Sequence, residues 1–524
     1  MKGAEILIKT LIEENVDTVF GYPGSSVLEI YDALYKHPEI RHILTSHEQG
    51  AVHAADGYAR SSGRVGVCIA TSGPGATNLV TGIATAYMDS VPIVAITGNV
   101  STKLLGKDSF QEVDIFGITM PITKQNFIVK DVKYLKETVK RAFEIAKSGR
   151  PGPVLIDITT DAISAECDTE HFVLNSQKKA HVFSEEDIKN AAKLINASKK
   201  PLIYVGGGAV ISGAYKEVRA LADVLNAPVI DSLMGKGVFP GNDKKYLGML
   251  GIFGTEEARK AVFDSDLLIA IGVRFSDRAM HGLSEILKEK KIIHIDVDYA
   301  EINKNAHSDV SIVGDAKKAL SVLLTEIKHK ERKLWRTGAE KRDSQNSDFA
   351  EENVVRTINK KLNENTIVVT EVGRHQMTAV SNYCFMNPRT LITSGGLGTM
   401  GYGMGAAIGA KLANPDKTVI DIAGDGCFRM NMNEILTAVR YKTPIIVFVM
   451  NNHSLGLVRD LQDEYCDGRH SCTDLEDTVD YVLLAESMHA KGFKVTNETE
   501  LENAIAEALK SDVPVIIDCE VTKK

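Results

Sequence analysis

A carboxylate and an amide stand at the ends of two apolar runs in the C-terminal third of the chain. Asp425 lies between two glycines directly after the run at 418–423, and Asn452 follows the run at 445–450. Because parallel strands end at one edge of their sheet, both oxygens could bind one hard cation, and the glycines would let backbone amides approach phosphate oxygens. The pattern favours Mg²⁺ bridging a diphosphate, although two ordinary turns would also explain it.

The runs around these residues belong to a pattern that extends along the chain. Short apolar, β-branched runs are mostly separated by helix-length segments, which is the βαβ rhythm of parallel sheets. These runs are 65–69, 91–97, 154–158, 202–205, 267–271, 292–297, 367–370, 418–423, 445–450 and 515–519. Ligands of such sheets lie beyond the carboxyl ends of the strands, where the informative residues fall.

Two polar stretches, 166–186 and 328–353, interrupt this rhythm and predict linkers. We expect the second, the most charged run of the chain, to be a solvated surface segment without a partner. The sequence therefore predicts an α/β protein of three doubly wound parallel-sheet domains, 1–165, 186–328 and 353–524.

Composition limits the classes of function. The 524 residues are 44% hydrophobic and 25% charged, with 42 glycines and 14 prolines, as in a folded globular chain. The formal charge of −8 gives no electrostatic reason to expect nucleic acid or an anionic membrane surface as a partner. No apolar run reaches ~18 residues and no signal or transit peptide is visible, so we expect no membrane span. Seven scattered cysteines without a CxxC pair favour a reducing, cytoplasmic location.

Beyond composition, the chain resembles a known enzyme family over essentially its whole length. The spacing from Asp425 to Asn452 is similar to that of the thiamine diphosphate motif, which runs from GDG to NN. Further segments stand in family order: GYPG at 21–24, HEQGA at 47–51, TSGPGATN at 71–78, DSFQE at 108–112, SGRPGPV at 148–154, GVRFSDR at 272–278, GGLGTMGYG at 395–403 and NEILTAVRYKTP at 433–444. Together they resemble the catalytic subunit of acetohydroxyacid synthase (acetolactate synthase), a flavin-containing thiamine enzyme.

The resemblance implies how the cation and the diphosphate are bound. Mg²⁺ would be held by the side chains of Asp425 and Asn452 and by the backbone carbonyl of Ser454. The residues that would contact the diphosphate are His375, Gly426 and Cys427. Cys427 would offer its backbone amide as a small packed residue and not act as a reactive thiol.

The resemblance also implies how the thiamine ring is activated. Glu48 would hydrogen-bond the pyrimidine ring, so that its exocyclic amine becomes the base for the thiazolium, although a glutamate here could also just cap a helix. Gly398 would present its carbonyl to the aminopyrimidine, and Met400 would buttress the bent cofactor. Met400 could equally be ordinary core filler. Phe110 and Gln111 would line the reaction face.

Three consecutive glycines, Gly206, Gly207 and Gly208, follow the run at 202–205, where a dinucleotide phosphate could approach the backbone. A tight turn explains them equally well. The resemblance implies FAD in a non-redox role, and the residues that would surround it are Arg150, Arg274, Arg278, Asp296 and Asp315, with Leu233, Met234, Leu250 and Gly251 as the apolar wall. Arg278 would also receive the carboxylate of the second keto acid, unless it forms a structural salt bridge.

Two departures from the family pattern bear on the substrate. The family usually has a tryptophan where this chain has Leu461, and that tryptophan favours 2-ketobutyrate as the second substrate. The only tryptophan, Trp335, falls in the second linker. The chain stops at Lys524, whereas the family generally continues with a tail over the active site, so we expect a more open pocket.

The resemblance implies an acetolactate synthase of branched-chain amino acid biosynthesis, which decarboxylates pyruvate and joins the two-carbon unit to a second 2-keto acid. The alternative is another thiamine diphosphate-dependent 2-keto acid decarboxylase or carboligase. A degenerate nucleotide-binding protein without activity is disfavoured because Glu48, Asp425 and Asn452 occur together. The family implies a homodimer or homotetramer, with a small regulatory subunit as a further candidate partner.

Overall fold

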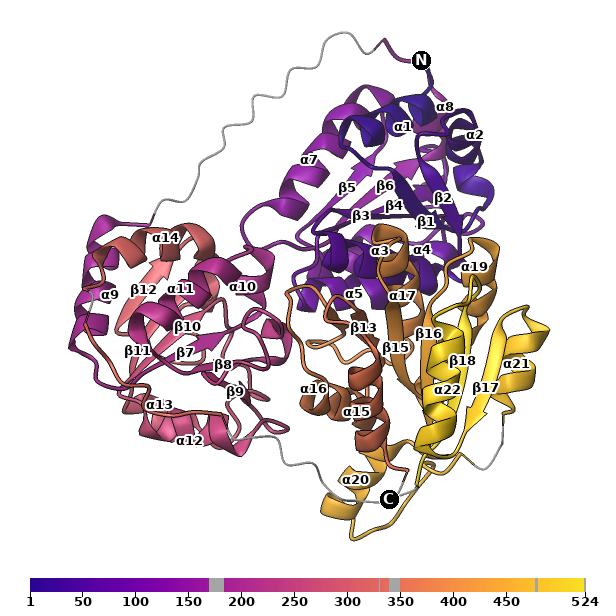
Figure 1. Ribbon diagram of the computed structural model, residues 1–524. Helices are drawn as coiled ribbons and strands as arrows, with labels where there is room; N and C mark the ends of the chain where they lie inside the picture. Colours follow the sequence, from indigo (N-terminus) through magenta and orange to yellow (C-terminus); the bar gives the residue numbers. More distant parts are fainter. Residues whose placement is uncertain (169–182, 329, 339–348, 476–478, 523–524) are drawn as a thin grey trace.

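The computed structural model describes residues 1–168, 183–328, 330–338, 349–475 and 479–522. These residues form three parallel six-stranded sheets with helices around them, which confirms the predicted fold class (Figure 1). No named helix or strand of the described ranges runs from one sheet's part of the chain into the next. The exact domain boundaries stay a prediction. Within the same ranges, no helix is both long and apolar enough to cross a membrane.

The first sheet has the strand order β2-β1-β3-β4-β6-β5. Its strands are β1 Thr18–Gly21, β2 Arg41–Leu44, β3 Gly66–Ala70, β4 Ile93–Asn99, β5 Gln125–Val129 and β6 Val154–Thr159. The helices are α1 Gly3–Glu13, α2 Leu28–Lys36, α3 Glu48–Ser62, α4 Pro74–Asn78, α5 Val80–Met88, α6 Ile115–Thr119, α7 Leu135–Lys147 and α8 Thr160–Ser164. The interior strands β3, β4 and β6 are buried at every residue, as expected where helices cover both faces.

The third sheet repeats this topology. Its order, β14-β13-β15-β16-β18-β17, places the strands in the same relative positions as in the first sheet. Its strands are β13 Ile367–Thr370, β14 Leu391–Thr393, β15 Val419–Gly424, β16 Ile446–Asn451, β17 Lys491–Val495 and β18 Val515–Glu520. The helices are α15 Glu351–Lys361, α16 Arg374–Asn382, α17 Gly403–Ala413, α18 Asp425–Asn431, α19 Ile435–Arg440, α20 Gly456–Tyr465, α21 Tyr481–Ser487 and α22 Glu498–Ala508.

The central sheet has a different order, β12-β11-β10-β7-β8-β9. Read from β9, the strands run third, second, first, fourth, fifth, sixth, which is the order of dinucleotide-binding folds. Its strands are β7 Pro201–Val205, β8 Val229–Asp231, β9 Tyr246–Met249, β10 Leu267–Ile271, β11 Lys291–Asp296 and β12 Val310–Val313. The helices are α9 Glu185–Ala197, α10 Gly207–Ile211, α11 Tyr215–Leu225, α12 Glu256–Asp264, α13 Ser284–Lys288 and α14 Ala316–Glu326.

Helices α3 and α17 join the first domain to the third (Figure 1). Their backbones touch where glycines replace side chains. A Cβ atom on Gly57 would lie 2.1 Å from the carbonyl oxygen of Ala406, and one on Gly409 would lie 1.8 Å from that of Ala54. Only glycine permits this approach, so these two glycines help to fix the position of the first domain relative to the third.

The expectation of a solvated second linker is wrong for residues 330–338. The indole of Trp335 packs against the central core and donates a hydrogen bond to the carbonyl of Pro201 at 2.9 Å. Arg332 donates to the carbonyl of Ile195 at 3.2 Å. The partly buried indole thus holds this charged stretch against the central domain. Of the first predicted linker, 166–186, residues 169–182 lie outside the described residues.

Candidate active site

Asp425 lies where the sequence predicts, at the carboxyl edge of the third sheet. Strands β15 and β16 are neighbours, with Gly424 opposite Met450, so the residues after them meet. Asp425 is 1% exposed, and burial raises the pKa of its carboxyl. Its Oδ1 accepts a hydrogen bond from the amide of Gly426 at 2.9 Å, whereas Oδ2 has no partner within the described residues. A buried, half-satisfied carboxylate is unfavourable alone and fits a site for a cation.

The other two predicted Mg²⁺ ligands form the loop beside Asp425. Asn452 Oδ1 accepts hydrogen bonds from the amide and hydroxyl of Ser454 at 3.0 and 3.1 Å. Between them, the backbone of His453 acts on the Asp425 carboxylate and lowers its pKa, in opposition to the larger effect of burial. The structure therefore brings all three residues to one edge. Their role as ligands stays a prediction.

His375 and Cys427 lie next to this edge. The His375 ring packs on Gly424, where a Cβ atom would lie 2.7 Å from the ring. Burial lowers the pKa of His375 to about 3, so the ring is neutral, and its Nε2 has no partner in the described part of the chain. The Cys427 thiol donates to the carbonyl of Val372 at 2.8 Å, and burial raises its pKa. The thiol therefore stays protonated, which agrees with a packed residue that offers its backbone.

The loop of residues 394–401 carries Gly398 and Met400. The Ser394 hydroxyl accepts a hydrogen bond from the amide of Thr399 at 3.0 Å, and Glu371 accepts one from the amide of Gly401 at 2.8 Å. Each end of the loop is therefore held by a buried polar side chain of the third domain.

Sequence reasoning missed Glu371, although a carboxylate directly after the run at 367–370 is the same signal that identified Asp425. Burial raises the pKa of Glu371 to about 7. Burial also holds the pKa of the neighbouring Asp421 well above its ordinary range, and the charge of Glu371 raises the pKa of Asp421 further.

Glu48 is the first residue of α3, but it does not cap that helix. His47 does, because its ring accepts a hydrogen bond from the amide of Gln49 at 3.0 Å. Glu48 Oε2 instead accepts from the Asn78 side chain at 2.9 Å. Its Oε1 lies over Gly75 of α4, where a Cβ atom would be 3.2 Å away. The capping interpretation is thus unnecessary, and Asn78 is an orienting residue that the sequence did not reveal.

Phe110 and Gln111 lie on the same side of the first domain. Gln111 has a left-handed φ of 57° and backs onto Gly73, whose added Cβ atom would be 2.9 Å from it. The Phe110 ring is 84% exposed. Among the described residues, no hydrogen bond or ion pair links Glu48, Phe110 or Gln111 to the Asp425 edge. The predicted thiamine residues thus fall into two groups on different domains, without a direct polar contact between the two groups in the described part of the chain.

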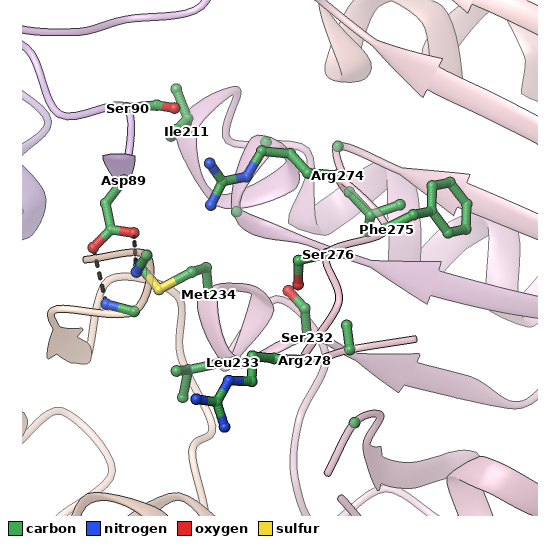
Figure 2. Close-up of a pocket in the computed structure, with 18 of the residues that line it drawn as sticks. Asp89, Ser90, Ile211, Ser232, Leu233, Met234, Arg274, Phe275, Ser276 and Arg278 are labelled. Carbon is green, nitrogen blue, oxygen red and sulfur yellow. Dashed lines mark hydrogen bonds between the residues drawn. The ribbon is translucent and has the colours of Figure 1, made fainter. Parts of the chain in front are cut away.

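A cavity of about 650 Å³ lies between the three domains (Figure 2). The predicted flavin residues that line it are Arg150, Gly207, Gly208, Leu233, Met234, Leu250, Gly251, Arg274, Arg278, Asp296 and Asp315, and Gly398 joins them from the third domain. Gly206 is the exception. Its backbone packs on Gly272, where a Cβ atom would be 2.2 Å from the carbonyl oxygen, so close packing explains this glycine without a ligand.

Several lining residues were not predicted. They are Asp89, Ser90, Tyr204, Ser232, Phe275 and Gln376, among others. Asp89 and Ser90 lie in the turn between α5 and β4, at the opposite edge of the first sheet from Glu48. A helix-to-strand turn carries no chemical signature in the sequence, so nothing there indicated that this edge faces a cavity.

Positive side chains, three arginines and Lys147, line the cavity. Arg150 donates to the Ser90 hydroxyl at 2.8 Å and to Glu301 at 2.8 Å, which joins the first domain to the central one. Arg274 donates to the carbonyl of Met88 at 2.7 Å. Of the predicted carboxylates, burial raises the pKa of Asp296 to about 6. A dinucleotide diphosphate would find cations close to the glycine turn of β7.

Two further predicted residues have distinct surroundings. Asp315 caps α14 by accepting a hydrogen bond from the amide of Lys318 at 2.9 Å. Arg278 is exposed and forms no ion pair with any described residue, so the salt-bridge alternative finds no support. Glu464 raises the pKa of Tyr465 and Arg278 opposes that shift, which places the Arg278 guanidinium near the end of α20.

Comparison with known proteins defines the class. The chain matches the N-terminal TPP binding domain of thiamine pyrophosphate enzymes at residues 1–118, their central domain at 188–323 and their C-terminal TPP binding domain at 371–519. The three matches follow the three sheets in order. The fold and the three family matches together define a thiamine pyrophosphate (thiamine diphosphate) enzyme.

Whole-chain relatives narrow the class further. The chain is 46% identical to the probable acetolactate synthase large subunit of Methanocaldococcus jannaschii, over 99% of this chain and 91% of that protein. It is 41% identical to acetolactate synthase isozyme 3 large subunit of Escherichia coli, over 97% and 92%, and 45% identical to the acetolactate synthase large subunit of Corynebacterium glutamicum, over 99% and 86%. The chain belongs to the acetolactate synthase large-subunit family.

Proposed function

We propose that this protein decarboxylates pyruvate and joins the resulting two-carbon unit to a second 2-keto acid, giving acetolactate when that acid is pyruvate. The observation that carries this proposal is the buried Asp425 with its unpartnered oxygen, next to the neutral His375 at the end of β15. That arrangement suits a cation and a diphosphate in a chain whose relatives are named acetolactate synthases.

Asp425, Asn452 and the Ser454 carbonyl would hold Mg²⁺, and the amides of Gly426 and Cys427 would contact the diphosphate. Thiamine diphosphate, when bound, supplies the electron sink for loss of CO₂. The protein's own contribution begins with Glu48, whose carboxylate would hydrogen-bond the pyrimidine ring and promote proton movement there. Asn78 keeps Glu48 in place by donating to Oε2.

We also propose that the cavity between the domains binds FAD in a non-redox role. Support comes from the dinucleotide-type strand order of the central sheet and from the position of Gly207 and Gly208 after β7. Arg150 and Arg274 would offset the charge of a diphosphate, since each retains guanidinium donors that its protein contacts do not use.

The minimal active species is proposed to be a homodimer, which can assemble further into a homotetramer. Two observations favour this: among the described residues no hydrogen bond or ion pair links Glu48 to Asp425, and Phe110, a predicted reaction-face residue, is exposed. The family resemblance implies that the first domain of one chain would meet the third domain of its partner. Two-fold symmetry would then produce two identical sites. The relatives' designation as large subunits supports a small regulatory subunit as a further partner.

Arg278 would receive the carboxylate of the second keto acid, because its guanidinium lines the cavity free of an ion pair with the described residues. Its position near α20 places it on the side of Leu461. A leucine in place of the indole of the family favours broad acceptor use. It also supports a second candidate, a decarboxylase that releases the aldehyde, because a less enclosed site admits water.

One assay separates these functions. Purified protein is incubated with thiamine diphosphate, Mg²⁺, FAD and pyruvate, and the products are quantified. Acetolactate as the main product supports the proposal, acetaldehyde as the main product supports the decarboxylase, and the absence of both contradicts either function.

A further inference from the structure

One loop of the third domain belongs to both predicted cofactor sites. Residues 394–398 line the large cavity between the domains. Gly398, the last of these, and Met400, two residues later, are the predicted supports of the thiamine ring. The loop is rich in glycine, and Gly398 and Gly401 have left-handed φ values of 72° and 81°. Its shape must therefore be fixed largely by contacts made through its backbone.

Asp89 of the first domain supplies the central contacts. Asp89 is one of the residues that line the cavity, and its side chain is fully buried (Figure 2). Asp89 Oδ2 accepts a hydrogen bond from the amide of Gly395 at 2.9 Å, and Oδ1 accepts one from the amide of Gly396 at 2.7 Å. One buried carboxylate thus binds two consecutive backbone amides across a domain boundary, and charge makes both bonds strong.

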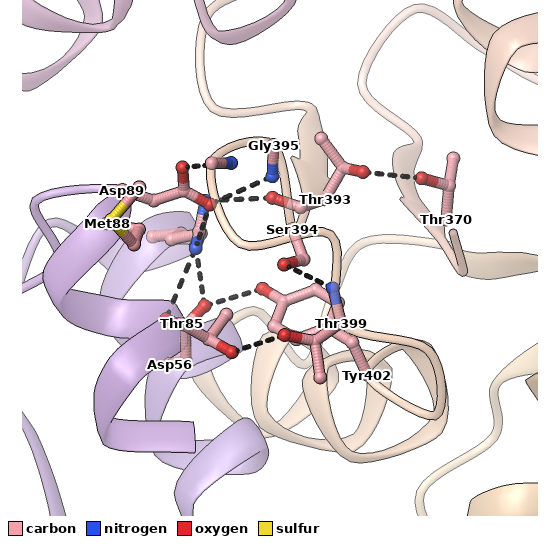
Figure 3. A network of polar contacts seen from close by, with 12 residues as sticks. Asp56, Thr85, Met88, Asp89, Thr370, Thr393, Ser394, Gly395, Thr399 and Tyr402 are labelled. Atoms are coloured by element: carbon pink, nitrogen blue, oxygen red, sulfur yellow. Dashed lines mark hydrogen bonds and ion pairs between the residues drawn. The ribbon is translucent and has the colours of Figure 1, made fainter. Parts of the chain in front are cut away.

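A buried network holds Asp89 and both ends of the loop (Figure 3). Arg60 donates to Asp89 Oδ2 at 3.0 Å and to the carbonyl of Thr393 at 2.9 Å. Arg60 also pairs with Asp56, which in turn accepts a hydrogen bond from the Tyr402 hydroxyl at 2.5 Å. Thr393 precedes the loop and Tyr402 follows it. The first domain therefore contacts the residue before the loop through Arg60, the loop's glycines through Asp89 and the residue after the loop through Asp56.

We propose that Asp89 is a positioning residue that couples the two cofactor sites by ordering the loop of residues 394–401. A flavin packed against residues 395–398 would restrict the loop, and thiamine diphosphate would then meet Gly398 and Met400 already in place. The coupling must be reciprocal, so each cofactor tightens the binding of the other. This proposal rests on the proposed function, because it assumes that both cofactors bind.

Asp89→Asn is the direct test, because asparagine keeps the volume but replaces one acceptor oxygen by a donor. Its NH₂ group would face an amide or Arg60, which leaves at least one buried donor unsatisfied. Asp157→Asn is the matched control. Asp157 is another buried carboxylate of the first domain, and its partners Thr97 and Asn99 do not reach the loop.

Calorimetry on cofactor-free protein measures the affinity for thiamine diphosphate with Mg²⁺, without FAD and with saturating FAD. In the parent and in Asp157→Asn, FAD should tighten binding at least about fivefold, the lower end of ordinary coupling. In Asp89→Asn the ratio should fall below about twofold. A parent ratio near one, or an Asp89→Asn ratio equal to that of the parent, overturns the coupling.

Hydrogen exchange of the cofactor-free proteins separates this proposal from the proposed function. Asp89→Asn should speed amide exchange in residues 393–402, and Asp157→Asn should not. Thr85→Val is a milder second variant, and it should speed exchange less. It removes the hydroxyl contact of 2.7 Å with Thr399, together with a bond of 2.9 Å to the carbonyl of Thr81 within α5, and it leaves the Asp89 contacts in place. Unchanged exchange in both loop variants overturns the role of Asp89. A parent that binds no thiamine diphosphate overturns the proposed function and the coupling together, whereas exchange still decides whether Asp89 orders the loop.

Discussion

The cavity between the domains and the predicted thiamine site differ in how far one chain brings their residues together. The cavity brings together eleven of the predicted flavin residues with Gly398, drawn from all three domains. The thiamine residues instead fall into two groups, one around Glu48 and one around Asp425. Contacts between the domains of one chain thus build the cavity, whereas under the proposed dimer a second chain would complete the thiamine site.

The topology explains this difference. The first and third sheets have the same strand order, and each places its informative residues beyond the carboxyl ends of its strands. Within one chain these domains meet through α3 and α17, whose glycines fix their approach. That contact positions Asp89 on the loop of residues 394–401 but leaves Phe110 exposed.

Glu48→Gln should have the largest effect. The amide keeps the size of the side chain and can still accept from Asn78, but it cannot supply the charged hydrogen bond to the pyrimidine ring. We expect the turnover of pyruvate to fall by about 10²–10⁴-fold. Glu39→Gln, an exposed glutamate of the same domain, is the control. A Glu48→Gln rate within about threefold of the parent would remove Glu48 from the mechanism.

Asp425→Ala should weaken Mg²⁺-dependent binding of thiamine diphosphate. Loss of a residue that only orients a metal ligand typically costs 10–100-fold, so loss of the ligand itself should cost at least about 100-fold. Calorimetry with Mg²⁺ and with a chelator measures the effect. The exposed Asp416→Ala should bind as the parent does. Equal affinities in Asp425→Ala and the parent would show that this carboxylate holds no cation.

Leu461→Trp should have a smaller effect, on the product ratio alone. Leucine is shorter than tryptophan and lacks the indole plane, so the parent should prefer neither pyruvate nor 2-ketobutyrate by more than roughly tenfold. A tryptophan that walls off the acceptor pocket could add shape-dependent discrimination of one methylene, which reaches ~1–3 kcal/mol. The variant should shift toward the 2-ketobutyrate product in a competition assay, without a large change in the decarboxylation of pyruvate. Leu483→Trp, on the exposed face of α21, is the control. An unchanged ratio in Leu461→Trp would place residue 461 outside the acceptor pocket.

Glu371 should produce the smallest effect, on stability as a function of pH. Its pKa is raised by burial from 4.5 to about 7 in the folded protein. The folded state thus keeps a proton that the unfolded state releases, so stability falls as the pH rises from about 4.5 to about 7. Glu371→Gln should lack this decline.

The melting temperature of Glu371→Gln, relative to that of the parent, should therefore rise across the same window and stay level above pH 7. Each 1 kcal/mol corresponds to about 2–4 °C in a domain of 150–250 residues. The exposed Glu364→Gln should follow the parent at every pH. A difference between Glu371→Gln and the parent that does not depend on pH would contradict the shift.

The sequence predicted the interior of the fold better than its edges. All ten apolar runs are strands, and every one lies inside a sheet. The six edge strands, β2, β5, β9, β12, β14 and β17, fall outside those runs. An interior strand is covered by helices on both faces and reads as continuously apolar, whereas an edge strand such as β17 has exposed residues.

The candidate site could be predicted where a polar side chain comes directly after an apolar strand. Asp425 and Asn452 lie as expected, and the same rule would have identified Glu371. The residues that join domains could not be found this way. Asp89 lies in a helix-to-strand turn, and Arg60 lies within α3, so their partners are set by how α3 and α17 pack and not by any local pattern.

Mixing two inactive variants tests most directly whether the thiamine site is shared between chains. Glu48→Gln and Asp425→Ala proteins are each assayed alone, then unfolded together in equal amounts, refolded and assayed for acetolactate. If each site takes Glu48 from one chain and Asp425 from its partner, half the dimers are mixed and each contains one intact site. Activity should then return to about one quarter of a refolded parent sample. Mixtures that stay as inactive as the separate variants, although mixed dimers are present, would contradict a thiamine site shared between two chains.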